Sequence, residues 1–168
     1  MGYLGAIVTL PTIRSRGIVR NKDGSLSIYL SPHEKSVLGS LPDQTVALAR
    51  AGDASTARLF PPAYIDDPYS EADYITFTRT DLVDSCAQAL ELFKTTLNSP
   101  SISEADAYIW LRALNSIRLV IGTKLNIQQD EIAPDPETIS EDDIRSQGLL
   151  LYGYLTWLQS ELIEALNS

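Results

Sequence analysis

The last helical segment of the sequence is the feature that most constrains the fold. Apolar residues or glycine recur at alternating spacings of four and three, which places them on one face of a helix. The members of this series are Ile144, Gly148, Leu151, Leu155, Leu158 and Leu162. The middle of the segment adds further apolar residues, Leu149, Leu150, Tyr152, Tyr154 and Trp157. A helix that is hydrophobic almost all round is typical of the centre of a bundle or of a contact between subunits.

Three earlier segments also carry helix signals. Ser31, followed by proline and then Glu34, predicts a capped helix, and Pro42 predicts that this helix stops or kinks. A second amphipathic helix is expected from Thr78 to about residue 98, and a third from residue 101 or 103 to about 125. Ser140 followed by an acid three residues later predicts where the final helix begins.

The sequence before these helices predicts a β-hairpin over residues 13–31. Two β-leaning runs flank the stretch 21–24, whose Asn, Asp and Gly residues suit a tight turn. In the first run Arg14, Arg16, Arg20 and Lys22 share one side of the strand, which we expect to be exposed. Cations on an edge strand also protect it against unwanted pairing.

We expect one domain over residues 1–168, mainly α, with a four-to-five-helix bundle and the N-terminal β-hairpin. A chain of 168 residues with 44% hydrophobic content can bury a substantial core. The bundle is expected over 32–167, interrupted by a Pro/Asp-rich loop at 53–73 and an acidic linker at 127–143. Apolar residues of the first loop, Leu59, Phe60, Tyr64 and Ile65, are expected to pin it to the core.

The charge balance argues against nucleic acid or a membrane surface as partner. The chain has 13 Lys and Arg residues against 22 Asp and Glu residues, a formal net charge of -9. A field of this sign repels phosphate backbones and anionic lipids. A DNA-binding transcriptional regulator is the alternative, and it depends on the basic hairpin, whose cations lack interleaved aromatic residues.

The sequence contains few of the residues that catalysis requires. His33 and Cys86 are the only histidine and cysteine, which leaves no nucleophile–base pair with a supporting motif and no zinc ligand set. We therefore expect no cofactor and no enzymatic activity. A hydrolase that uses a carboxylate-bound metal is the lowest-ranked alternative, and acids at residues 66–73 are its densest cluster.

The location expected from the sequence is the cytoplasm. A single cysteine suits a reducing compartment. The apolar opening over residues 1–13 has no basic region before it and no small-residue cleavage pattern, and it is too short to span a bilayer. We expect neither a secretion signal nor a membrane anchor.

A polar stripe on the third predicted helix supplies the candidate site. Arg112, Asn115 and Arg118 recur at spacings of three on an otherwise apolar helix. If this stripe is desolvated, each guanidinium needs an acceptor, and the candidate acids are Asp66, Asp67, Asp81 and Asp84. The stripe is interpreted either as an ion-pair network that fixes helix packing or as a pocket for an anion or a partner's tail.

Three blocks of sequence carry a family resemblance. They read ARLFPPAY followed by DDP, then WLRALN followed by RLVIGTKL, and finally YGYLTWLQ. In order and spacing they resemble the actinobacterial proteins of the domain of unknown function two-thousand-seventeen family, over about residues 13 to 166. Members of that family are uncharacterised and are commonly encoded beside the Clp protease adaptor ClpS. The resemblance implies a role near regulated proteolysis and supplies no activity.

Together these features predict a non-enzymatic interaction or regulatory protein. The apolar final helix and the arginine stripe both suit a contact with a protein partner or self-association as a homodimer. Either outcome would use surface that the bundle does not bury.

Overall fold

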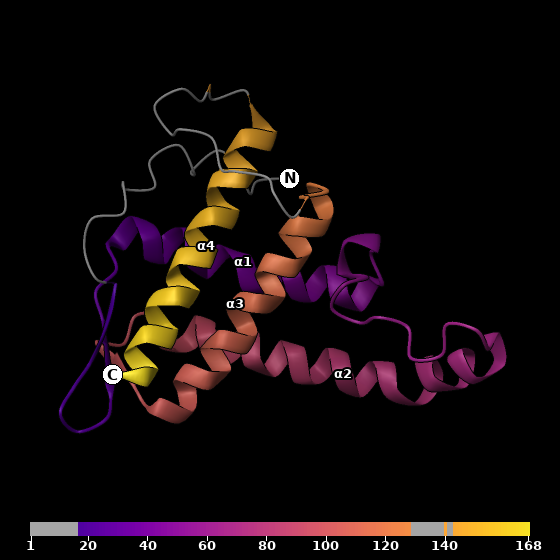
Figure 1. The fold of residues 1–168 in the computed structure, drawn as a ribbon, viewed down its shortest axis with the longest axis horizontal. Helices are drawn as coiled ribbons and strands as arrows, with labels where there is room; N and C mark the ends of the chain where they lie inside the picture. Colours follow the sequence, from indigo (N-terminus) through magenta and orange to yellow (C-terminus); the bar gives the residue numbers. More distant parts are fainter. Residues whose placement is uncertain (1–16, 129–139, 141–142) are drawn as a thin grey trace.

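The computed structural model describes residues 17–128, 140 and 143–168. This part of the chain is mainly α-helical, as the sequence predicts, and a small sheet packs at one end of the helices (Figure 1). The elements are β1 (Ile18–Arg20), β2 (Leu26–Ile28), α1 (Pro32–Ala51), the 3-10 helix η2 (Ala54–Thr56), α2 (Pro68–Thr96), β3 (Ser101–Ile102), α3 (Glu104–Lys124) and α4 (Ile144–Asn167). Most of the expected acidic linker, and the start of the expected hairpin, lie outside the described residues.

The predicted hairpin is confirmed where the structure describes it. β1 and β2 pair antiparallel, with Ile18 opposite Ile28. Gly24 has a φ of 85° in the turn, a conformation that glycine adopts without steric cost. The sequence did not predict β3, whose Ile102 lies opposite Leu26. A strand of two residues has no detectable period, and its partner is far away along the chain.

The expectation that the cationic side of the first strand is exposed is wrong for β1, whereas Lys22, in the turn that follows, is exposed. Ile18 is buried on that side, and Arg20 lies next to the ends of two helices. Arg20 Nη1 donates to the Leu166 carbonyl at 3.0 Å, and Nη2 donates to Glu104 at 2.6 Å. Removing the apolar Ile18 side chain from water is favourable, so this side of the strand faces the helices. The cations before residue 17 lie outside the described residues.

The first turn of α1 forms as the sequence predicts, but Pro42 does not end the helix. Ser31 and Glu34 form a capping box in which each side chain accepts a backbone N–H from the other residue. Proline removes the N–H that would bond to the carbonyl of Leu38. The helix continues to Ala51 because Pro42 and its neighbours are buried against the bundle, which offsets the lost hydrogen bond.

The largest difference from prediction concerns α2. The sequence predicts a connection over 53–73 and a helix beginning at Thr78, whereas α2 begins at Pro68 and extends for 29 residues. Asp67 is its N-cap, so the predicted cap at Thr78 lies inside the helix. The first half of α2 lacks the amphipathic period of a packed helix, because this half does not pack on the core.

The other two helix starts are close to those predicted. Ser103 caps α3. The cap of α4 is Asp143, not Ser140 as predicted, and its carboxylate accepts the Ser146 N–H at 3.0 Å and the Ser146 hydroxyl at 2.6 Å. An aspartate here gains a further advantage over serine, because its charge interacts favourably with the positive end of the helix dipole.

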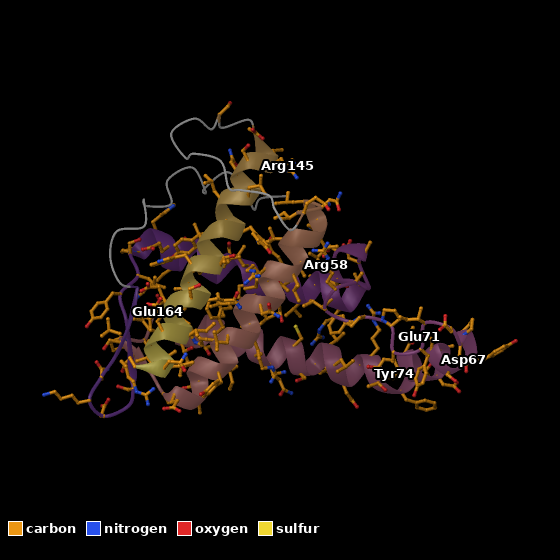
Figure 2. All side chains as sticks on the ribbon, in the orientation of Figure 1. Arg58, Asp67, Glu71, Tyr74, Arg145 and Glu164 are labelled. Atoms are coloured by element: carbon orange, nitrogen blue, oxygen red, sulfur yellow. The ribbon has the colours of Figure 1, made fainter. Side chains whose placement is uncertain are left out.

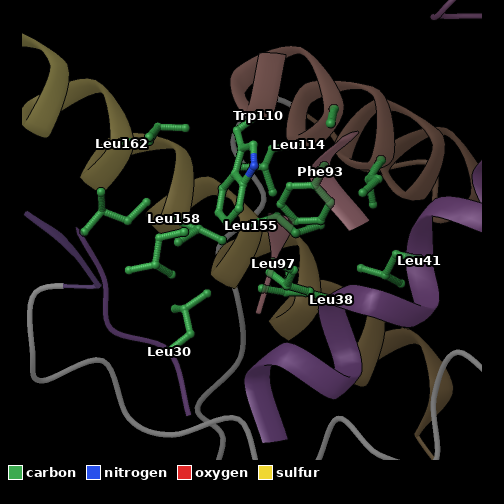
Figure 3. Close-up of a cluster of buried hydrophobic side chains, with 14 of the residues drawn as sticks. Leu30, Leu38, Leu41, Phe93, Leu97, Trp110, Leu114, Leu155, Leu158 and Leu162 are labelled. Carbon is green, nitrogen blue, oxygen red and sulfur yellow. The ribbon is translucent and has the colours of Figure 1, made fainter. Parts of the chain in front are cut away.

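The core lies between the four helices and the small sheet, and Figure 3 shows part of it, with side chains of α1, α2, α3 and α4. Trp110 and Phe93 are fully buried, and their rings meet edge to face with centroids 4.7 Å apart. The indole N–H of Trp110 donates to the Thr96 hydroxyl at 2.8 Å, which satisfies a buried donor. The predicted apolar series of α4 is buried in this core, except for Ile144, which is exposed at the start of the helix.

One buried polar contact joins α4 to the start of α1. The Tyr154 hydroxyl donates to Glu34 Oε1 at 2.9 Å, and both residues are buried. The other oxygen of Glu34 accepts the Ser31 N–H at 2.7 Å. Burial, reinforced by the Glu34 carboxylate, raises the pKa of Tyr154 far above its usual value. Tyr154 is therefore a neutral hydrogen-bond donor at neutral pH.

Substituting Tyr154→Phe should lower the free energy of unfolding by about 1–3 kcal/mol, because one oxygen of a buried carboxylate loses its partner. Urea denaturation measures the change. The control is Tyr152→Phe on the same helix, which removes a hydroxyl that forms no hydrogen bond with the described residues and should change stability by less than about 0.5 kcal/mol. Equal losses in the two variants would contradict the role given to the Tyr154–Glu34 contact.

Candidate functional site

The N-terminal half of α2 extends beyond the bundle (Figure 1). The first buried residue of α2 is Val83, so the preceding turns have no core to pack against. We call residues 64–82 the arm; it comprises the end of the preceding loop and this half of the helix. Asp67, Glu71 and Tyr74 mark its outer part, away from α3 and α4 (Figure 2).

Exposed apolar side chains are concentrated on the arm. The described part of the chain exposes ten large hydrophobic residues, and six belong to the arm, namely Tyr64, Ile65, Tyr69, Ile75, Phe77 and Leu82. Tyr69 is 87% exposed and Phe77 is 78% exposed. The expectation that Tyr64 and Ile65 pin the loop to the core is wrong, since both are exposed. An apolar patch of this kind marks a surface for interaction.

Local hydrogen bonds give the arm its shape. Asp67 accepts the N–H groups of Tyr69 and Ser70 at 3.1 and 3.2 Å, and it accepts the Ser70 hydroxyl at 2.6 Å. The hydroxyl of Ser70, followed by its N–H, holds the pKa of Asp67 below its usual value. The Tyr64 N–H donates to Glu71 at 2.7 Å, so the loop is fastened to the first turns of the helix.

A cleft of about 570 Å³ separates the inner side of the arm from the end of α1 and from residues 57–62. Its walls are mainly apolar and include Phe60, Ile75 and Leu82. The Arg79 guanidinium lies over the Phe60 ring, 5.5 Å from its centroid. This volume lies in the range of pockets that enclose a drug-sized ligand.

The charged side chains of the cleft differ in their hydrogen-bond partners. Asp53 accepts the N–H and the hydroxyl of Ser55 at 2.9 and 2.5 Å, and these bonds, the hydroxyl first, hold the pKa of Asp53 below its usual value. Glu71 accepts the loop N–H described above. Arg79 forms no hydrogen bond or ion pair with any residue that the structure describes. The cleft thus presents one cation whose donors are unused.

The predicted arginine stripe does not form one site. Arg112 is exposed and donates to the Ser85 hydroxyl on α2 at 3.0 Å. Arg118 donates to Gln159 on α4 and lies over the Tyr152 ring, 5.2 Å from its centroid. Six residues of α-helix rotate a side chain by about 240°, so the two arginines face different neighbours. Asn115 is exposed on the same helix.

The predicted acidic counterparts lie elsewhere. Asp84 pairs with Arg50 at 3.6 Å, because it faces α1 while its neighbour Ser85 faces α3. Asp66 and Asp67 belong to the arm, and Asp81 is exposed near its base. Among the described residues, none of these acids forms an ion pair with either arginine of the stripe. The carboxylate-neutralised network expected from the sequence is therefore wrong.

Arg118 has an unusual environment for a charged side chain. Its Nε is buried and has no hydrogen-bond partner among the residues that the structure describes. Its charge is balanced by the ring of Tyr152 and the amide oxygen of Gln159 in place of a carboxylate. Its stem packs between α3 and α4. This is a structural role for Arg118 in the helix packing.

The structure does not favour a metal centre in the residues it describes. No three His, Cys, Asp or Glu side chains of residues 17–128, 140 and 143–168 are grouped so that they could hold an ion. No helix in the same ranges has the length and apolar character needed to cross a bilayer.

Sequence reasoning missed the residues that make the arm distinctive. Tyr69 and Phe77 lie eight residues apart, and the position midway between them is Asp73, so no continuous apolar series joins them to a core-facing side. Arg79 is the only base within the acidic segment 64–82, and its position in a cleft depends on Phe60 from another element. Only the tertiary structure brings that pair together.

The two stripe arginines should differ in their effect on stability. Arg118→Ala should cost about 1–3 kcal/mol, because it removes packing between α3 and α4 and leaves Gln159 without its donor. Arg112→Ala should cost less than about 0.5 kcal/mol, because an exposed side chain loses one contact. Chemical denaturation of both variants measures the difference, and a larger loss for Arg112→Ala would contradict the assignment.

The cap of the arm should respond to acid. The pKa of Asp67 is lowered in the folded protein, so its contribution is complete above the unfolded value of 3.8 and is lost as the pH falls through the folded value. We expect the amide NMR signals of Tyr69 and Ser70 to shift in one step that is centred below pH 3.8. Asp67→Asn should abolish this step, whereas Asp66→Asn should leave it in place; a step centred above 3.8 would contradict the cap.

Comparison with known proteins gives one match. No curated protein matches the chain, and neither does any solved structure. The model of the family described as Domain of unknown function (DUF2017) matches residues 15–166. This range contains the arm, the cleft and all of the four α-helices except the last residue of α4. The chain therefore belongs to the DUF2017 family.

Proposed function

We propose that this chain is a non-enzymatic interaction or regulatory protein that binds a partner protein through the arm. The observation that carries the proposal is the concentration of exposed apolar residues on a helix that extends beyond its own core. Aromatic side chains such as those of Tyr69 and Phe77 are the common anchors of protein interfaces. Exposing them to water is unfavourable unless a partner covers them.

The charge of the arm specifies the partner's chemistry. Residues 64–82 contain five acids, Asp66, Asp67, Glu71, Asp73 and Asp81, and one base, Arg79. The complementary surface is apolar at its centre and has lysines and arginines at its rim. Two copies of the arm would bring like charges together, which disfavours self-association through this surface.

We further propose a cytoplasmic partner in regulated proteolysis, the setting that the resemblance to proteins encoded beside the ClpS adaptor implies. The single cysteine agrees with a reducing compartment. A DNA-binding regulator acting through the basic hairpin has less support, because Arg20 is engaged by Glu104 and by the backbone of Leu166.

The arm is tested by the double variant Tyr69→Ser/Phe77→Ser, which removes its two most exposed aromatic side chains without touching the core. The control is Tyr29→Ser/Ile163→Ser, which removes exposed apolar groups elsewhere. A photo-crosslinking residue at position 76 of the full chain identifies the bound protein by mass spectrometry, and titration calorimetry with that purified protein gives the affinity. We expect a loss of at least about 30-fold in the arm variant and less than about threefold in the control.

The affinity should also fall as salt is raised, because a basic rim faces an acidic arm. Equal affinities of the arm variant and the control would overturn the proposal. Light scattering that finds a dimer, which the arm variant converts to monomer, would replace the separate partner with a second copy of this chain.

A further inference from the structure

Arg79 is held in position on the cleft wall by contacts that leave its donors free. Its guanidinium lies over the ring of Phe60, and Nη2 approaches the end of α1, 3.5 Å from the place a Cβ on Gly52 would occupy. The carboxyl end of a helix carries a partial negative charge that attracts the cation. These contacts orient the side chain, but none is a hydrogen bond to Arg79.

A half-buried guanidinium with unused donors favours an acceptor from outside the protein. Arginine presents its N–H groups as a planar fork that matches the two oxygens of a carboxylate. The two carboxylates that line the cleft each accept protein donors through one oxygen, Asp53 Oδ1 from Ser55 and Glu71 Oε2 from the Tyr64 N–H. Among the charged residues that line the cleft, Arg79 is the one that forms no hydrogen bond with a described residue, so its donors are available to a ligand.

The other residues of the cleft further restrict the charge and polarity of the ligand. Its apolar lining, from Leu59, Phe60, Pro61, Pro62, Ile75 and Leu82, suits an apolar group. Asp53 and Glu71 also line the cleft, so a doubly charged phosphate meets more repulsion there than a singly charged carboxylate. The combination favours a single negative charge next to an aliphatic or aromatic body.

We propose that this cleft binds a carboxylate attached to an apolar side-chain segment of a peptide, with Arg79 as the carboxylate ligand and Phe60 as its support. The peptide carboxylate comes from a chain terminus or from an acidic side chain, since both present the same two oxygens. This inference deepens the proposed function, on which it rests for the peptide's origin in a partner protein. The chemistry of the cleft can be tested without that partner.

Synthetic peptides added to the full chain provide the test. The probes are an acetylated tripeptide of glycine, leucine and phenylalanine with a free carboxylate, the same tripeptide as the C-terminal amide, and an amide-capped peptide with aspartate before phenylalanine. NMR titration follows the Arg79 Nε–H signal and the amides of Gly52, Leu59 and Leu82, which line the cleft. We expect at least one carboxylate peptide to shift these signals and to bind at least tenfold more tightly than the uncharged amide.

Variants of Arg79 distinguish the effect of its charge from the effect of its planar guanidinium geometry. Arg79→Gln should lower the affinity for the carboxylate peptide at least tenfold, and Arg79→Lys, which keeps the charge but loses the fork, should lie between Gln and the unmodified protein. Arg112→Gln is the matched control, because it removes an exposed arginine that does not line the cleft and whose guanidinium donates to Ser85. It should leave the affinity unchanged.

Three results would overturn the inference: equal binding of carboxylate and amide peptides, no change on Arg79→Gln, or binding of inorganic phosphate as tight as that of the peptide acid. The Tyr69→Ser/Phe77→Ser variant should retain peptide binding, since neither residue lines the cleft. Peptide binding in the cleft and partner binding by the outer side of the arm can therefore be tested independently. Loss of partner binding in the arm variant together with no peptide binding would reject the cleft alone.

Discussion

The packing of Trp110 against Phe93 is the contact on which the arrangement of the helices depends. Their rings join α3 to the C-terminal half of α2, and the apolar side of α4 covers them. The indole N–H requires an acceptor inside the core, and Thr96, the last residue of α2, supplies it. This contact fixes where α2 ends against the bundle. Because a helix is straight over many residues, it also sets the direction in which the other half of α2 leaves the core.

The single helix α2 therefore lies in two environments. Its C-terminal half is held by the core, and helix extension from a formed segment is favourable because each added residue gains a hydrogen bond without a new nucleation step. At its far end, Asp67 closes the helix and Glu71 fastens the loop. Local hydrogen bonds replace tertiary packing there. The result is an ordered helix whose apolar side chains remain exposed to solvent.

The acids of the arm stabilise its local structure through hydrogen bonds. Asp67 is used as a cap and Glu71 as a loop acceptor, and Asp53 closes the turn before η2. Arg79 alone among the charged cleft residues has donors that no described residue uses. An acidic surface with one available cation differs from a surface of uniform charge, because it can select both the sign and the position of a ligand's charge.

Much of the fold was predictable from the sequence because it depends on local chemistry. The Ser31 capping box, the turn at Gly24 and the apolar series of α4 each specify their own structure through hydrogen bonds and periodicity. Pro42 does not end α1, which is one of the two outcomes that the sequence predicted there, since burial against other helices outweighs one lost hydrogen bond. The 3-residue strands were detectable through their turn, whereas β3 depends on a neighbour distant in the chain.

The site was less predictable, because its residues are distinguished by the contacts with the core that they lack. The sequence placed Arg112 and Arg118 on one stripe, but helix rotation directs one toward α2 and the other toward α4. The sequence by itself determined that the chain forms helices with a small hairpin and that its net charge is negative. Only the tertiary structure decided which half of α2 finds a core, and hence which apolar side chains stay exposed and which arginine faces a cleft. Burial is a property of the assembled helices, and no single helix contains that information.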